Sequence, residues 1–148
     1  MEMYRLFVAL HLLGSAVWVG GHLVLSLSVL PRALRLRSPA IVQEFEEGFE
    51  RIGIPSLLLQ VATGLWLAYF RLPDVASWFF PSSQQAAFIL VKLALLTATV
   101  ALAAHARLRI IPKLDSANLR FLAYHVAAVT LLGVAFLIVG VAIRTGGI

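Results

Sequence analysis

The stretch HLLGSAVWVGGHLVLSLSVLPR, residues 11–32, decides the class of fold. It is almost wholly apolar and long enough to cross ~30 Å of hydrocarbon, which takes about 20 helical residues. It nevertheless contains His11, Trp18 and His22. Polar side chains are costly in lipid and usually face the interior of a bundle. The stretch therefore predicts a transmembrane helix that presents imidazoles to partner helices.

The composition of the whole chain supports this class. Of its 148 residues 61% are hydrophobic and 13% are charged, and the mean hydropathy is +0.93. A soluble domain is about half apolar and about one quarter charged. The chain has no cysteine, which excludes disulfides, thiolate metal sites, iron–sulfur clusters and covalent c-type haem attachment. We therefore predict an all-α integral membrane protein, a four-helix up-and-down bundle that forms a single transmembrane domain over residues 1–148.

Four apolar runs are long enough to be spans, and we place them at about residues 4–30, 54–70, 85–111 and 120–143. The first loop contains SPAIVQEFEEGFERIG, residues 38–53, whose apolar residues recur at helical spacing. Ser38 can cap a helix there, with Pro39 at its first position. This pattern predicts a short interfacial helix in loop one.

The basic residues are distributed unequally between the two sides of this bundle. Loops one and three carry eight of them, and the other side carries three: Arg32, Arg35, Arg37, Arg51, Arg107, Arg109, Lys113 and Arg120 against Arg5, Arg71 and Arg144. By the positive-inside rule, loops one and three face the cytoplasm and both termini lie outside a bacterial-type inner (plasma) membrane. We interpret the net charge of +5 as this topology signal. The expected partner is thus a lipid bilayer and not nucleic acid, and homo-oligomerisation stays open.

The four histidines fall at two depths when depth is counted at about 1.5 Å per helical residue. His22, His105 and His125 share one depth in the cytoplasmic half, whereas His11 lies in the outer half with Lys92 at about its level. Eleven residues are about three helical turns, so His11 and His22 share a helix face, together with Trp18. We expect the three inner histidines, from three helices, to converge on a haem or a metal ion.

A b-type haem needs one or two axial ligands, a slot lined by small residues and cations near its propionates. The four histidines are the expected ligands of one or two haems or, alternatively, of copper. Gly64 fits the slot, and Arg32, Arg107 and Arg109 stand where propionates could end. The alternative readings are helix packing for the small residues and topology for the arginines. Trp18 is read as packing or as an electron relay, and Lys92 as a ligand or substrate contact or as a snorkelling anchor.

A haem iron takes at most two of the three inner histidines. Spans one and three are diagonal in a simple up-and-down bundle, and spans three and four are neighbours. This placement favours His22 with His105 slightly over His22 with His125, and it leaves His125 in a supporting role. In the second span Ser56, Gln60 and Thr63 form a polar stripe, which we interpret mainly as interhelical hydrogen bonding.

Three segments of the chain carry a resemblance to known families: HLLGSAVWVGGHLVLSLSVLPR, QVATGLWL and FILVKLALLTATVALAAHARL. They resemble the membrane-embedded CopD family of copper-resistance proteins and the HemJ-type protoporphyrinogen oxidases. The matching positions are His11, Trp18, Gly20, Arg32, Gly64 and Lys92. The HemJ-type resemblance implies a b-type haem and oxidation of protoporphyrinogen, with His11 and Lys92 important. The CopD resemblance implies copper handling in the cell envelope.

Three functions follow as hypotheses. The first, which we favour, is a b-type haem-binding redox protein that transfers electrons within the bilayer, with a quinone, a porphyrin or a redox protein as partner. The second is a HemJ-like oxidoreductase, although His22, His105 and His125 depart from that pattern. The third is copper handling. Imidazoles suit Cu(II), but the soft ligands that favour Cu(I) are limited to Met1 and Met3.

Overall fold

The computed structural model describes residues 1–145, and four long helices dominate this part of the chain. Each helix is long and apolar enough to cross a membrane: Glu2–Leu36, Pro39–Arg71, Gln84–Lys113 and Leu119–Thr145. The described residues contain no strand. The expected all-α, four-span architecture is therefore confirmed, and each span extends beyond its predicted boundaries.

The first span consists of α1 (Glu2–Val24), a π-helical turn (Leu25–Val29) and α2 (Leu30–Leu36). It ends where Arg37 adopts the left-handed conformation with φ 49°. The N–H of Ser38 donates to the carbonyl of Ala33 at 3.0 Å, and that of Arg37 donates to the carbonyl of Leu34 at 3.3 Å. This pair of bonds is a Schellman motif, which satisfies the last carbonyls of a helix and reverses the chain.

The second span is α3 (Pro39–Arg71), a single helix of 33 residues. A helix that begins at Pro39 is confirmed, but it continues through Pro55 into the span and is not a separate interfacial helix. Ser38 precedes it without a side-chain capping bond. An internal proline removes one backbone hydrogen bond and crowds the preceding turn. Here Ser56 Oγ donates to the carbonyl of Ile52 at 2.7 Å in that turn, and the helix persists.

The third and fourth spans follow a short 3₁₀ helix at Val75–Trp78. The third comprises α4 (Gln84–His105), a π-helical turn (Ala106–Ile110) and a 3₁₀ turn (Ile111–Lys113), and the fourth is α5 (Leu119–Thr145). Both π-helical turns end close to a proline, Pro31 in the first span and Pro112 in the third.

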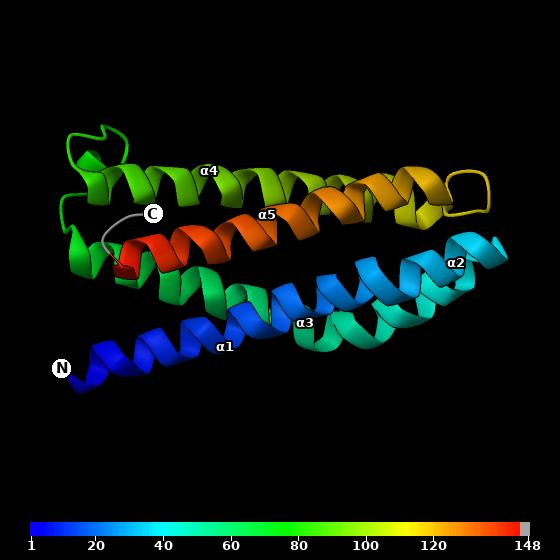
Figure 1. Cartoon of the computed structure of the whole chain (residues 1–148), viewed down its shortest axis with the longest axis horizontal. Coiled ribbons are helices and arrows are strands. Elements are labelled where there is room, and N and C mark those ends of the chain that lie inside the picture. The colour runs from blue at the N-terminus through cyan, green and yellow to red at the C-terminus, as the bar shows by residue number, and fades with distance from the viewer. Residues whose placement is uncertain (146–148) are drawn as a thin grey trace.

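The helices pair in a fixed order along the bundle. α1 makes its most extensive contact with α3 and also packs on α5, and α5 packs on α4. The N-terminus, the α3–α4 connection and the last described turn of α5 lie at one end, called here the terminus end (Figure 1). The α2–α3 turn and the α4–α5 loop lie at the other end, called here the basic end.

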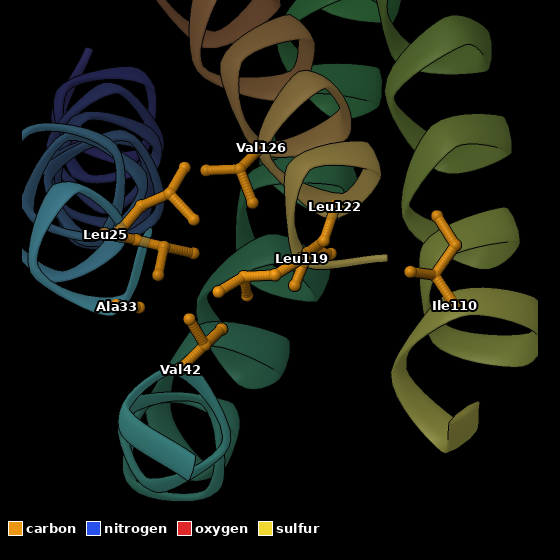
Figure 2. Close-up of a cluster of buried hydrophobic side chains, with 8 residues drawn as sticks. Leu25, Ala33, Val42, Ile110, Leu119, Leu122 and Val126 are labelled. Carbon is orange, nitrogen blue, oxygen red and sulfur yellow. The ribbon is translucent and has the colours of Figure 1, made fainter. Parts of the chain in front are cut away.

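The main buried apolar cluster lies towards the basic end. It joins α2 and its flanking turn to α3 and α5 through Leu25, Leu30, Ala33, Val42, Leu119, Leu122 and Val126, with Ile110 from the third span (Figure 2). Many large apolar side chains elsewhere are exposed, such as Leu27 at 75% and Leu131 at 70%. Apolar exposure of this extent is expected of helices whose outer faces meet lipid.

Candidate functional site

His11 lies in the seam between α1 and α3, in the half of the bundle nearer the terminus end. Its Nδ1 is 3.0 Å from the carbonyl oxygen of Gln60 and 3.0 Å from the hydroxyl of Thr63. A carbonyl oxygen only accepts, so Nδ1 carries the proton and Nε2 keeps its free lone pair. A Cβ on Gly64 would lie 3.0 Å from His11 Cε1, so this glycine gives the ring its space.

A cation and an orphaned oxygen accompany His11. Oε1 of Gln60 is buried without a hydrogen-bond partner. The Lys92 ammonium is within electrostatic range of His11 and of Arg71. Its Nζ lies 3.8 Å from where a Cβ on Gly140 of α5 would be. The one salt bridge within residues 1–145 joins Arg107 to Glu50, so Lys92 has no carboxylate partner there.

His22 also faces α3, as the shared face with His11 predicts. Its Nδ1 donates to the carbonyl of Trp18 at 2.9 Å, which leaves Nε2 free. The Trp18 ring lies 4.4 Å from the imidazole, centroid to centroid, and Phe49 of α3 meets it edge-on at 6.0 Å. Trp18 therefore packs on His22.

His105 and His125 form a pair between α4 and α5 near the basic end. Nδ1 of His105 lies 2.9 Å from Nε2 of His125. Nδ1 of His125 is 3.2 Å from the carbonyl of Phe121, so it carries the proton and Nε2 accepts from His105. The rings are nearly parallel, at 24° with centroids 5.0 Å apart. Their equal depth is thus confirmed.

The expected convergence of His22 with this pair is wrong. Within residues 1–145 no group of three or more histidine, aspartate or glutamate side chains is placed to hold a metal ion. The reason is the rotation of each helix about its own axis, which sets the direction in which a side chain points. Residue counting gives the depth of His22, but its ring points to Phe49 of α3, whereas His105 and His125 meet each other across the α4–α5 seam.

The predicted propionate arginines occupy three different settings. Arg107 donates to the carboxylate of Glu50 at 2.8 Å, so its charge is already paired. Arg32 lines a small hollow that it shares with Glu44, and Arg109 is exposed. They do not form one cationic cluster around a histidine.

Phe49 and Glu50 were not among the predicted site residues. A Cβ on Gly21 or on Gly53 would overlap or crowd the Phe49 ring, so that ring fills space left by two glycines. Small residues at helix seams are a general signal for close approach. Which aromatic ring fills the space depends on the register of α1 against α3, which a single sequence does not contain.

Comparison with known proteins gives one match. The family model for copper resistance protein D matches residues 43–143. No curated protein and no solved structure matches the chain. The matched region contains His105, His125, Gly64 and Lys92 but not His11, Trp18 or His22. With its four apolar spans, this multi-pass membrane protein belongs to the copper resistance protein D family, CopD.

Proposed function

We propose that this protein binds copper ions in the membrane and passes them on, with the His105–His125 pair as the binding site. One observation carries the proposal: two imidazoles from different helices lie with ring nitrogens 2.9 Å apart. Imidazole is a common copper ligand. Both residues fall within the region matched by the copper-resistance family model, which supports copper as the cargo.

Copper would replace the proton that the two rings share. In the ion-free pair the N–H of His105 Nδ1 donates to His125 Nε2. When copper enters, that proton moves to His105 Nε2, so both rings stay neutral. Two metal–nitrogen bonds of about 2 Å at the right angle of square-planar Cu(II) place the nitrogens roughly 2.8 Å apart. This is close to their 2.9 Å separation in the ion-free pair, so the rings need only turn their lone pairs towards the ion. His105 is exposed, so its ring can rotate. The hydrogen bond to the Phe121 carbonyl holds the His125 ring in place.

The donor set suits transfer more than storage. No third histidine or carboxylate of residues 1–145 joins the pair, so an ion bound there keeps open coordination positions. Water or a ligand on a partner can take these positions and then remove the ion. A closed site with four protein ligands would hold the ion more permanently.

Copper titration of purified variants tests this site. We expect His105→Ala and His125→Ala each to weaken Cu(II) affinity by about tenfold or more, and to reduce the nitrogen hyperfine structure of the electron paramagnetic resonance spectrum from that of two coordinated nitrogens to that of one. His22→Ala is the matched control, because this histidine lies on the α3 side and should leave both readouts unchanged. Wild-type affinity in His105→Ala would contradict the proposal.

A second candidate function, a b-type haem redox protein, is favoured by the His11 site. His11 offers a free Nε2 while its Nδ1 is held by the Gln60 carbonyl, which is how proteins orient an axial imidazole. The buried Gln60 Oε1 lacks a partner, and Lys92 could neutralise a propionate. When bound, haem would supply one-electron transfer to a quinone or redox protein, or accept electrons from a porphyrin substrate as in the HemJ-type enzymes.

The absorption spectrum of the purified protein distinguishes the two candidates. A Soret band, with sharp α and β bands on reduction, would support haem, and His11→Ala should then abolish these bands. His105→Ala serves as the control and should retain them. A colourless protein with the copper behaviour described above would reject the haem candidate and leave copper binding standing.

A further inference from the structure

A basic pocket lies at the basic end of the bundle, away from all four histidines. It has a volume of about 340 Å³ and is lined by Leu34, Arg37, Ser116, Ala117, Leu119 and Arg120. Residues from the α2–α3 turn thus meet residues from the α4–α5 loop and the first turn of α5. Two arginines that are far apart in the sequence share one hollow.

Neither arginine of this pocket has a carboxylate partner within residues 1–145, where the one salt bridge joins Arg107 and Glu50. The second hollow at this end differs from the basic pocket, because it is lined by both Arg32 and Glu44, whose opposite charges offset each other. Asp115 does not line the basic pocket. Its carboxylate instead accepts from the N–H groups of Ala117 and Asn118, both at 2.9 Å.

The backbone of Arg37 gives independent support for a ligand. This residue is the one non-glycine residue with positive φ among the described residues, at 49°. The position is the one in a Schellman motif that glycine usually fills, because a Cβ is disfavoured there. An arginine at a position where the backbone favours glycine indicates that its side chain has a use.

The loop and helix opposite Arg37 are held firmly. Asn118 Nδ2 donates to the carbonyl of Lys113 at 2.6 Å, and the N–H of Asp115 donates to Asn118 Oδ1 at 3.0 Å. These bonds fix the loop that carries Ser116 and Ala117. The first turn of α5 adds the positive end of a 27-residue helix, whose N–H groups favour an anion.

We propose that this pocket binds a phosphate group, and that the source is the headgroup of an anionic phospholipid. Arginine recognises phosphate through paired, charge-assisted hydrogen bonds, and Ser116 can donate a third. Arg37 directly follows the span that ends at Leu36, and Arg120 is the second residue of the span that begins at Leu119. The pocket therefore lies at the level of lipid headgroups, where basic pockets between helices take anionic lipids.

Lipid binding by matched arginine variants tests the proposal. Native mass spectrometry counts the phosphatidylglycerol retained by the purified protein, with phosphatidylcholine as the neutral comparison. We expect the double variant Arg37→Gln/Arg120→Gln to lose phosphatidylglycerol affinity by about tenfold or more, since each arginine contributes charged hydrogen bonds. The control Arg35→Gln/Arg109→Gln removes the same charge at the same end and should bind like the wild type.

Two further variants separate binding from folding. Arg37→Gly suits the left-handed backbone, so its melting temperature should rise or hold while phosphatidylglycerol binding falls. Ser116→Asp places a carboxylate in the pocket from the opposite loop and should also abolish binding. Equal losses in the two double variants would overturn the proposal, because the attraction would then be a general effect of surface charge.

Inorganic phosphate distinguishes the two sources of the group. Protection from thermal unfolding by phosphatidylglycerol but not by millimolar inorganic phosphate supports a lipid headgroup. Protection by both that Arg37→Gln/Arg120→Gln removes supports the pocket and assigns it to phosphate more generally. Protection by neither, with wild-type lipid retention in Arg37→Gly, would overturn the assignment.

Discussion

At the scale of single residues, two adjacent glycines of α1 have opposite surroundings. A Cβ on Gly21 would overlap the Phe49 ring of α3, whereas a Cβ on Gly20 would meet nothing within 4 Å. Phe49 cannot easily retreat, because it also borders Gly53 and stacks on Phe45 at 5.7 Å. We expect Gly21→Ala to lower the free energy of unfolding by about 1–3 kcal/mol, through overpacking.

Gly20→Ala is the matched control for that variant. It removes the same glycine flexibility from the same helix without a steric cost, so it should leave stability unchanged or raise it by up to about 1 kcal/mol. Denaturant unfolding in detergent, followed by helical circular dichroism, measures both. Equal stability of the two variants would show that α1 and α3 are not packed in this register.

Arg37 adopts a backbone conformation that is unfavourable for a residue with a side chain. The left-handed conformation at φ 49° disfavours a residue with a Cβ by roughly 1–2 kcal/mol. Arg37→Gly should therefore raise the free energy of unfolding by about 1 kcal/mol, as measured by the same unfolding method without added anionic lipid. A marked fall would mean that the arginine side chain stabilises the turn itself.

The sequence predicted the depths of the histidines better than their groupings. Depth follows from position along a helix, and this was enough to predict that His105 and His125 lie level with each other and that Lys92 lies at about the level of His11. The rotation of each helix against its neighbours was not available. For this reason His22 was assigned to the wrong cluster, although its shared face with His11 was correct.

At the level of elements, both π-helical turns end two residues before a proline: Leu25–Val29 before Pro31, and Ala106–Ile110 before Pro112. A proline ring clashes with the carbonyl four residues earlier, and a wider turn relieves such a clash. A π turn also holds one residue more than an α turn. Each wide turn thus lets its span continue past a residue that would otherwise break it.

Single-residue deletions test this reading of the first span. Deletion of Ser28 from the π-helical turn should convert it to an α turn, keep α1 and α2 in register and yield folded protein. Deletion of Ala16 from regular α1 rotates the two sides of the cut by about 100°, which would turn His11 away from Gln60. Helicity and elution in detergent should be normal for the first variant and abnormal for the second. The reverse result would show that the π turn is required.

The continuity of α3 was not predictable from local pattern alone. Ser38, Pro39 and the apolar spacing correctly predicted a helix from Pro39, but the same pattern over residues 38–53 predicted a separate helix that ends before the second span. In the structure the residues before Pro55 pack through Val42, Phe45 and Phe49 against the first span. Tertiary contacts of this kind hold a helix together across an internal proline, and they depend on a partner that is distant in the sequence.

At the scale of the whole molecule, the helix order α3–α1–α5–α4 explains why the histidines separate. α1 packs on α3 and α5, while α4 packs on α5, so α1 and α4 are not close partners. The sequence predicted that spans three and four are neighbours, and this is confirmed. A ligand shared by His22 and His105 would have to pass α5, so two separate imidazole sites follow from the order of the helices.

The charges at its two ends predict the orientation of the bundle in the membrane. Eight lysine and arginine residues lie in the half of the molecule nearer the basic end, three lie towards the terminus end, and Lys92 lies within the third span. Positively charged loops are retained on the cytoplasmic side, so both termini should lie outside. The chain has no cysteine, so in a single-cysteine variant the introduced thiol is the one group that the maleimide can label. Ser82→Cys, in the α3–α4 connection, should react with an impermeant maleimide in intact cells. Ser38→Cys and Ser116→Cys, at the basic end, should react only after permeabilisation. The opposite pattern would place the histidine pair and the basic pocket on the outer side of the membrane, where the headgroup composition and the copper supply are different.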